Sequence, residues 1–187
     1  MNSRLCLGVM GAASTLMFAT NLHAQTPRAQ FGVAATVDVR AHFDGQPHPK
    51  GLIGDVVVRV KDTGTIAFAV VGAVGRTSVH QITPVFSKEY HATSFIGGAR
   101  VEMLTGTWFR PFGEVLAGGL RYAHDEEVSN IFGTGFSDHS THWGGTYGGG
   151  AGVDIGSRRV MLSVEAFGGH ALRRVTVGVS FGFGRSR

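Results

Sequence analysis

Residues 174–183, with the sequence RVTVGVSFGF, alternate apolar side chains with small or polar ones along their whole length. Successive side chains of an extended strand point to opposite faces, so this segment predicts a strand with one apolar and one polar face. The same alternation also fits the last strand of a soluble domain, and the interpretation therefore depends on the rest of the chain. The apolar face carries Val175, Val177, Val179, Phe181 and Phe183, and the other face carries Arg174, Thr176, Gly178, Ser180 and Gly182.

The other end of the chain has the features of a secretory signal peptide. Arg4 precedes an apolar stretch over residues 5–19, and the small residue Ala24 stands directly before Gln25. We interpret residues 1–24 as a cleavable signal peptide and residues 25–187 as a single exported domain. The one cysteine of the sequence, Cys6, lies within the signal peptide, so we expect no disulfide in the exported domain.

Composition narrows the class of the exported domain. The whole sequence has 17 basic and 13 acidic residues, and they are scattered along the chain. Nucleic-acid binding normally needs a concentrated basic face, so we do not expect it. No part of residues 25–187 has the run of about 18 consecutive apolar residues typical of a transmembrane helix. Two classes remain, which are a soluble exported β-protein and a transmembrane β-barrel.

Strand-like alternation recurs along the whole exported domain. In the first segment the polar face includes Asp38 and Arg40, which would be costly to bury in a dry core, so the apolar face must point toward lipid. From Phe31 to Phe43 a strand is about 40 Å long and, tilted by about 40°, rises about 30 Å, which matches a bilayer. The expected strands cover residues 30–43, 52–61, 66–75, 93–103, 108–122, 142–155, 160–168 and 174–183.

The connections between these strands alternate in length. Residues 62–65, 104–107 and 156–159 are short turns, whereas residues 44–51, 76–92 and 123–141 form longer loops. Short periplasmic turns and longer outer loops are typical of bacterial outer-membrane barrels. In hydrocarbon an open sheet edge is excluded, so the first strand must pair with the last. The prediction is an all-β, eight-stranded antiparallel up-and-down transmembrane β-barrel, whose interior is just wide enough to be filled by side chains.

The expected interior carries a nearly balanced set of charges. Such a balance favours ion pairs that plug the barrel over an ion path, and we expect their centre at Arg100, Glu102, Glu114 and Glu165. Glu114 is placed inside because of its charge, although Phe112 and Leu116 share its face. The inward-facing set comprises Asp38, Asp55, Glu102, Glu114, Asp154 and Glu165 with Arg40, Arg59, Lys61, Arg100 and Arg174.

Thr176, Gly178, Phe181 and Phe183 form a pattern that resembles the C-terminal signal by which assembly machinery recognises outer-membrane barrels. Together with residues 148–165, GGGAGVDIGSRRVMLSVE, and the signal peptide, the chain resembles the small eight-stranded outer-membrane β-barrel protein family. This resemblance implies a Gram-negative outer membrane, contact with its lipid and lipopolysaccharide, and the barrel assembly machinery as a partner. Residues 184–187 depart from the family, which often ends on the aromatic residue itself.

Candidate chemistry is sparse. Lipid A deacylases, which are barrels of this class, carry a His-x-Ser-Asn motif, and this sequence has only the adjacent pair His139-Ser140. Asp138, His139 and His142 have side chains suited to zinc, and residues 125–127, DEE, could be relieved of repulsion by a divalent cation. His80, His91 and His124 show no recognisable ligand spacing. We interpret all of these as solvated loop residues and predict no catalytic residue, cofactor or metal.

The long outer loops are the better candidates for function, because loops often carry binding residues. We predict a non-enzymatic structural or surface-interaction protein, active in adhesion or envelope integrity, whose extracellular ligand the sequence does not name. The alternatives are a small channel or transporter, a lipid A-modifying enzyme and a soluble exported barrel. Apolar residues expected to be exposed in these loops are Val79, Ile82, Val85, Phe86, Tyr90, Val128, Ile131, Phe132 and Phe136.

Overall fold

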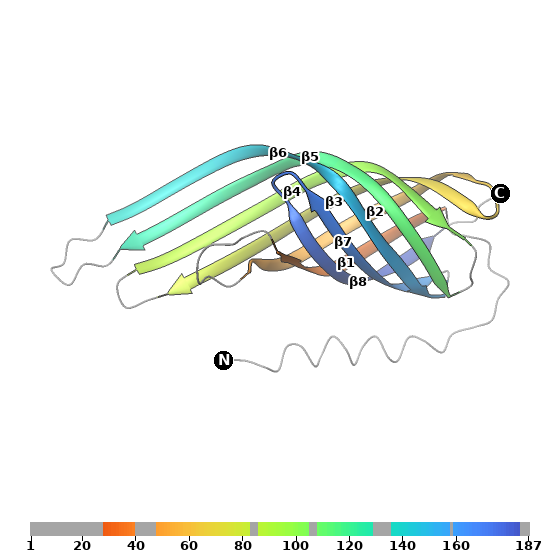
Figure 1. Cartoon of the computed structure of the whole chain (residues 1–187). Helices are drawn as coiled ribbons and strands as arrows, with labels where there is room; N and C mark the ends of the chain where they lie inside the picture. The colour runs from red at the N-terminus through yellow and green to blue at the C-terminus, as the bar shows by residue number, and fades with distance from the viewer. Residues whose placement is uncertain are drawn as a thin grey trace.

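A computed structural model describes residues 28–39, 48–82, 86–104, 108–128, 136–157 and 159–183. Each strand pairs antiparallel with the next along the chain, and the first pairs with the last, so the sheet closes into a barrel (Figure 1). The predicted fold class is confirmed, and none of the described segments is a helix long and apolar enough to cross a membrane. The strands are β1 (Ala29–Asp38), β2 (Lys50–Asp62), β3 (Ile66–Ile82), β4 (Phe86–Met103), β5 (Phe109–Val128), β6 (Phe136–Gly156), β7 (Val160–Gly169) and β8 (Arg173–Phe183).

The barrel closes where the sequence predicted, between β8 and β1. The register runs from Ala29 opposite Phe183 to Asp38 opposite Arg174. At the end of the barrel where β1 begins and β8 ends, the rings of Phe31 and Phe183 pack edge to face, with centroids 5.7 Å apart. Alternation in both strands therefore turns their apolar residues to the same outer face, and no sheet edge is left unpaired at this seam.

The wall of the barrel is apolar outside and mixed inside. Exposed apolar side chains on the outer face include Val33, Leu52, Val70, Phe95, Val115 and Val177. Inside, the core residues include Ile53, Val71, Ile96, Leu116, Leu120 and Phe167. On β5, Glu114 is buried together with Phe112 and Leu116, which resolves the uncertain phase of this strand in the predicted direction.

Lys61 is a correction to the predicted interior. The register between β2 and β3 shifts between Arg59 and Lys61, where one extra residue of β2 is accommodated. Such a bulge changes the face to which the next side chains point. Arg59 is buried, and Lys61 is exposed at the end of the strand.

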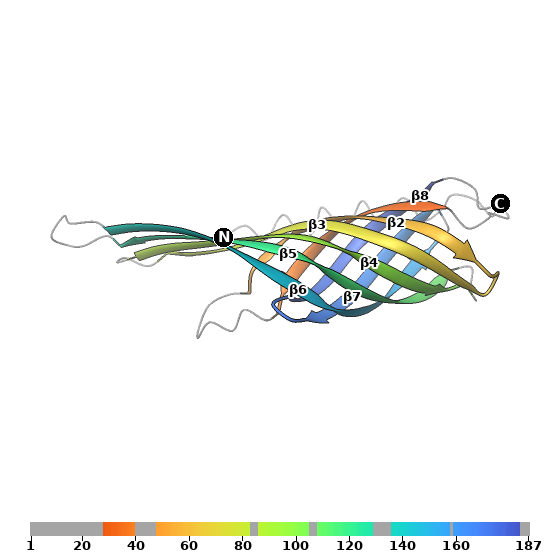
Figure 2. The same cartoon turned by 90° about the horizontal axis from the view of Figure 1, so that it is seen from above.

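Four strands continue far beyond the barrel. The strands β3, β4, β5 and β6 have 17, 18, 20 and 21 residues, whereas β1, β2, β7 and β8 have 10, 13, 10 and 11. Their outer parts form a narrow sheet that leaves the barrel at one end (Figures 1 and 2). We call this sheet the extension and define it as residues 77–82, 86–92, 122–128 and 136–142, which are joined row by row in one register.

The extension overturns the prediction of two long loops over residues 76–92 and 123–141. Most of those residues lie in strands. They lack the apolar alternation of a lipid-facing strand, because both faces of the extension carry mostly polar side chains, so periodicity could not reveal them. Residues 40–43, with Arg40 and Phe43 of the first predicted strand, lie outside the described residues.

Candidate functional site

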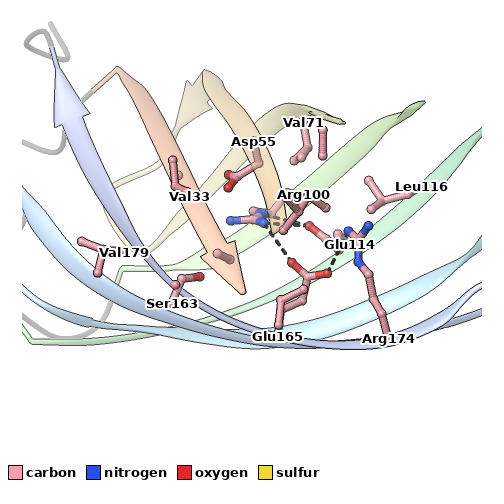
Figure 3. A pocket seen from close by; sticks show the side chains of 16 residues that line it. Val33, Asp55, Val71, Arg100, Glu114, Leu116, Ser163, Glu165, Arg174 and Val179 are labelled. Atoms are coloured by element: carbon pink, nitrogen blue, oxygen red, sulfur yellow. Dashed lines mark hydrogen bonds and ion pairs between the residues drawn. The ribbon is translucent and has the colours of Figure 1, made fainter. Parts of the chain in front are cut away.

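An ion-pair network lies across the middle of the lumen, the space enclosed by β1–β8. Arg100 of β4 donates to Glu114 of β5 through Nη2 at 2.9 Å and through Nε at 3.0 Å. Glu165 of β7 accepts a hydrogen bond from Arg174 Nη2 of β8 at 3.4 Å, and its other carboxylate oxygen lies 3.9 Å from Arg100 Nη2 (Figure 3). The guanidinium of Arg100 also stacks over the ring of Phe112, 3.8 Å from its centroid. These contacts thus link four strands through charges that are buried or, for Glu165, partly buried.

Glu102, which we expected among the central ion pairs with Arg100, Glu114 and Glu165, is buried in the lumen and pairs with Arg59. It accepts a hydrogen bond from Arg59 Nε at 2.7 Å and forms a separate buried pair. Arg59 lies on β2 and Glu102 on β4, so the two side chains must reach across β3. The inward residues of β3 beside them are Ala67 and Ala69, which are too small to block this contact.

The remaining predicted interior charges that the structure describes each lie next to different residues. Asp55 lies against Gly32, where an added Cβ would be only 2.0 Å from the Asp55 Oδ1 atom, so this glycine makes room for the carboxylate. Asp38 stands opposite Arg174 in the register of β1 and β8. Asp154 is buried on β6 opposite Arg110 of β5 and Ser163 of β7. Sequence reasoning missed Arg110, although it shares the alternation of Phe112 and Glu114.

Side chains leave little space in the described part of the lumen. The space bordered by Asp55, Arg100, Glu114 and Glu165 measures ≈ 20 Å³, which is room for little more than a water molecule (Figure 3). Another space of ≈ 20 Å³ lies beside Leu120 and Leu172. Toward the extension, Leu172 from the β7–β8 connection is buried in the core cluster. Tyr122 donates from its hydroxyl to the carbonyl oxygen of Ala171 at 3.0 Å and holds this connection in place.

The outward face of the extension carries a row of acidic and imidazole side chains. His80, Glu89, Asp125 and His139 stand opposite one another across β3, β4, β5 and β6. His80 Nδ1 lies 3.8 Å from Glu89 Oε1, and His139 Nδ1 contacts Asp125 Oδ1. His91, two residues along β4 on the same face, approaches Glu89 Oε1 with Nε2 at 3.2 Å.

The other face of the extension continues the inner surface of the barrel. Lys88 Nζ pairs with Glu126 Oε1 at 2.7 Å, and the ring of Tyr90 stacks on His124 at 4.3 Å. The hydrogen bond to Glu126 raises the pKa of Lys88, and the same bond lowers the pKa of Glu126. Both residues are partly exposed, so this pair contributes little to stability.

Several loop predictions need correction. Asp138 and His142 face the side opposite to His139, because neighbouring positions of a strand alternate, so these three residues cannot share one metal. Val79 is buried, whereas we expected it to be exposed, and Phe136 is exposed as expected. Val85, Ile131 and Phe132 lie outside the described residues, and the side chains of Ile82, Phe86 and Val128 are not described.

The C-terminal pattern occupies both faces of β8. Thr176 is buried in the lumen, Gly178 faces the same side, and Phe181 and Phe183 are exposed on the outer wall. Gly178 also lies close to β1, where an added Cβ would be 2.4 Å from the carbonyl oxygen of Val33. Recognition of this pattern by assembly machinery stays a prediction.

No protein-family model matches the sequence, and no curated protein matches it. Among solved structures, Ail, the attachment invasion locus protein of Yersinia pestis, is 13% identical, with a TM-score of 0.54 over 86% of this chain and 98% of Ail. Ail in complex with the heparin analogue sucrose octasulfate gives 15% identity and a TM-score of 0.51, over 83% and 96%. The N-terminal barrel domain of Pseudomonas aeruginosa OprF gives 18% identity and a TM-score of 0.46, over 85% and 100%. The chain has the eight-stranded barrel fold of small outer-membrane proteins.

Proposed function

We propose that this protein is a non-enzymatic barrel of the Gram-negative outer membrane that presents the extension outside the cell as an interaction surface. The observation that carries the proposal is the continuation of β3–β6 beyond a barrel whose lumen side chains nearly fill. A protein that needed only to span the membrane would not require these extra strand lengths. The extension is ordered by its backbone ladder, so it offers a preformed surface in place of mobile loops.

The orientation follows from the ends of the strands. The start of β1, the end of β8 and the short β2–β3 turn lie at the end of the barrel opposite to the extension (Figure 1). Outer-membrane barrels place their termini and short turns in the periplasm. A row of Arg76, Thr93, Arg121 and Trp143 crosses the outer face just below the extension. Tryptophan and arginine suit the level of lipid headgroups, so the extension begins where the lipid ends.

Conduction is the alternative that the lumen disfavours. Its centre is occupied by the Arg100, Glu114 and Glu165 network, and Leu172 closes the side toward the extension. A lipid A deacylase is disfavoured because its His-x-Ser-Asn motif does not occur in the sequence. Surface interaction remains the function that fits both the sealed barrel and the projecting sheet.

The charge of the extension narrows the chemistry of its partner. Its residues include five acidic side chains, five histidines and only one lysine. A sulfated polysaccharide needs a concentrated basic face, so the heparin analogue bound by Ail is not a fitting ligand for this extension. We therefore infer a partner surface that is neutral or basic, such as a protein on a host or neighbouring cell, with lipid and lipopolysaccharide around the barrel wall.

Labelling in intact cells tests the orientation. Ser137 is exposed in the extension, and Thr65 is exposed in the β2–β3 turn at the other end. With Ser137→Cys we expect reaction with a membrane-impermeant maleimide in intact cells, whereas Thr65→Cys should react only after the outer membrane is permeabilised. The reverse pattern would contradict the proposed topology.

Adherence tests the role of the extension. We expect a Gram-negative host that displays the full chain to adhere to a cultured epithelial monolayer more than the same host without it. A variant in which residues 78–91 and 123–141 are each replaced by Asn-Gly should lose this gain. Two-residue Asn-Gly turns suit antiparallel hairpins, so the barrel should still show heat-modifiable migration on a gel. Equal adherence of both forms would reject the extension as the interaction surface, and conductance steps in a planar bilayer would favour a channel.

A further inference from the structure

We propose that Glu89, His91 and Asp125 bind one divalent transition-metal ion of the zinc class on the outward face of the extension. This site differs from the sequence hypothesis of Asp138, His139 and His142, because it joins two strands through the register of β4 and β5. It goes beyond the proposed function and does not depend on which partner the extension meets.

The donor atoms already lie close together. One nitrogen of His91 and one carboxylate oxygen from each of Glu89 and Asp125 lie within 4.8 Å of one another. His91 Nε2 and Glu89 Oε1 are 3.2 Å apart. Two tetrahedral zinc ligands, each about 2.0–2.1 Å from the ion, are separated by roughly 3.3 Å, so this pair is already at ligand spacing. Within the described ranges, this is the one group of three such side chains that meets the distance criterion.

The charges of the cluster favour a cation. Glu89 and Asp125 stand directly opposite each other on neighbouring strands. Like charges at directly opposite positions destabilise a sheet, and a divalent ion between the two carboxylates would remove this repulsion. The side chain of Glu89 is 40% exposed and that of Asp125 45% exposed, so an ion from solvent can reach both.

The three histidines around the cluster differ in role: one would bind the metal, and two contact the carboxylates that bind it. His91 turns Nε2 toward Glu89, whereas its Nδ1 is buried and has no hydrogen-bond partner among the described residues. Nε2 is therefore the nitrogen that would bind the metal. His80 and His139 flank the row and contact Glu89 and Asp125 from the outer sides. Groups that hydrogen-bond to ligating side chains orient them and tune metal affinity, so we assign His80 and His139 as positioning residues.

The ligand types select the metal. Calcium and magnesium prefer sites built only from oxygen, and the imidazole of His91 does not suit them. One imidazole and two carboxylates without a thiolate suit zinc. Three protein ligands leave the fourth position of a tetrahedral ion open to water on the outward face, where a donor group from a partner can replace it.

The test uses the full exported chain without a histidine tag, folded in detergent and titrated with ZnCl₂ alone by calorimetry. We expect one zinc ion per chain. His91→Gln and Asp125→Asn should each weaken the affinity at least tenfold, and His139→Gln by roughly tenfold, as expected for a positioning residue. His142→Gln is the matched control, because His142 lies in the same extension on the other face, and it should leave the affinity unchanged.

Three results would overturn the proposal. These are the absence of saturable binding, equal losses in His91→Gln and His142→Gln, and displacement of zinc by an equal concentration of calcium. Heat-modifiable migration verifies that each variant is folded. Cobalt absorption by the unchanged chain provides a measurement without substitution, since intense visible bands report a tetrahedral site and weak octahedral bands would count against it. Maleimide labelling of Ser137→Cys is independent of zinc, so failure of this site and failure of the proposed topology are distinguishable.

Discussion

The lumen and the extension each hold an ion pair between the same two strands, and the two pairs differ mainly in burial. Arg100 and Glu114 lie opposite each other at 2.9 Å, with side chains 5% and 1% exposed. Lys88 and Glu126 also lie opposite each other, at 2.7 Å, and both side chains are 26% exposed. Distance alone would rank them as equals. Burial makes the loss of one partner costly in the lumen and nearly neutral in the extension.

The largest expected effect comes from breaking the lumen pair. Arg100→Met removes the cation that neutralises Glu114, approaches Glu165 and covers Phe112, and should lower the free energy of unfolding by about 3–5 kcal/mol. Urea unfolding in lipid vesicles, followed by tryptophan fluorescence, measures this loss. A change no larger than that of Lys88→Met would show that burial does not separate the two regions.

A glycine beside this network should give the next largest effect. An added Cβ at Gly98 would lie 1.9 Å from the carbonyl oxygen of Val115, so the backbone would have to move. We expect Gly98→Ala to lower the free energy of unfolding by about 1–3 kcal/mol in the same assay. Gly72→Ala is the matched control on the neighbouring strand, because a Cβ there meets nothing within 4 Å. Equal effects at the two glycines would contradict close packing of the wall.

Removing both charges of the lumen pair should cost less stability than removing one. Replacing a buried pair by apolar residues of similar volume is often nearly neutral, whereas removing one partner leaves a buried charge. Arg100→Met combined with Glu114→Leu should therefore recover at least half of the stability lost in Arg100→Met alone. Unfolding of the single and double variants under one set of conditions measures the recovery. A double variant as unstable as the single one would mean that Arg100 acts through Glu165 or Phe112.

The smallest effect is expected in the extension. Lys88→Met should change the stability of the barrel by less than about 1 kcal/mol, because an exposed pair is screened by water and salt. Repeating the unfolding at low and high salt checks this explanation, since any measurable loss should shrink as the salt concentration rises. A salt-independent loss would instead indicate packing of the Lys88 stem.

Predictions from sequence succeeded where the signal is local. Alternation over residues 174–183 places Phe181 outside and Arg174 inside, because successive strand residues always face opposite sides. The same reasoning failed in residues 76–92 and 123–141, where strands form without an apolar face. The sheet is held together there by backbone hydrogen bonds between neighbouring strands. These bonds do not require alternating apolar residues, so the sequence shows no periodic pattern.

The strand number, the closure of β8 on β1 and the face to which most charged side chains turn could all be predicted from the sequence. These properties follow from period-two alternation and from the need to pair every backbone group in lipid. Which charged side chains pair with one another became known only from the folded barrel. Glu102 reaches Arg59 across two alanines of β3, and Glu89 meets Asp125 because register aligns two strands. Register is a relation between distant segments, so no single stretch of sequence contains it.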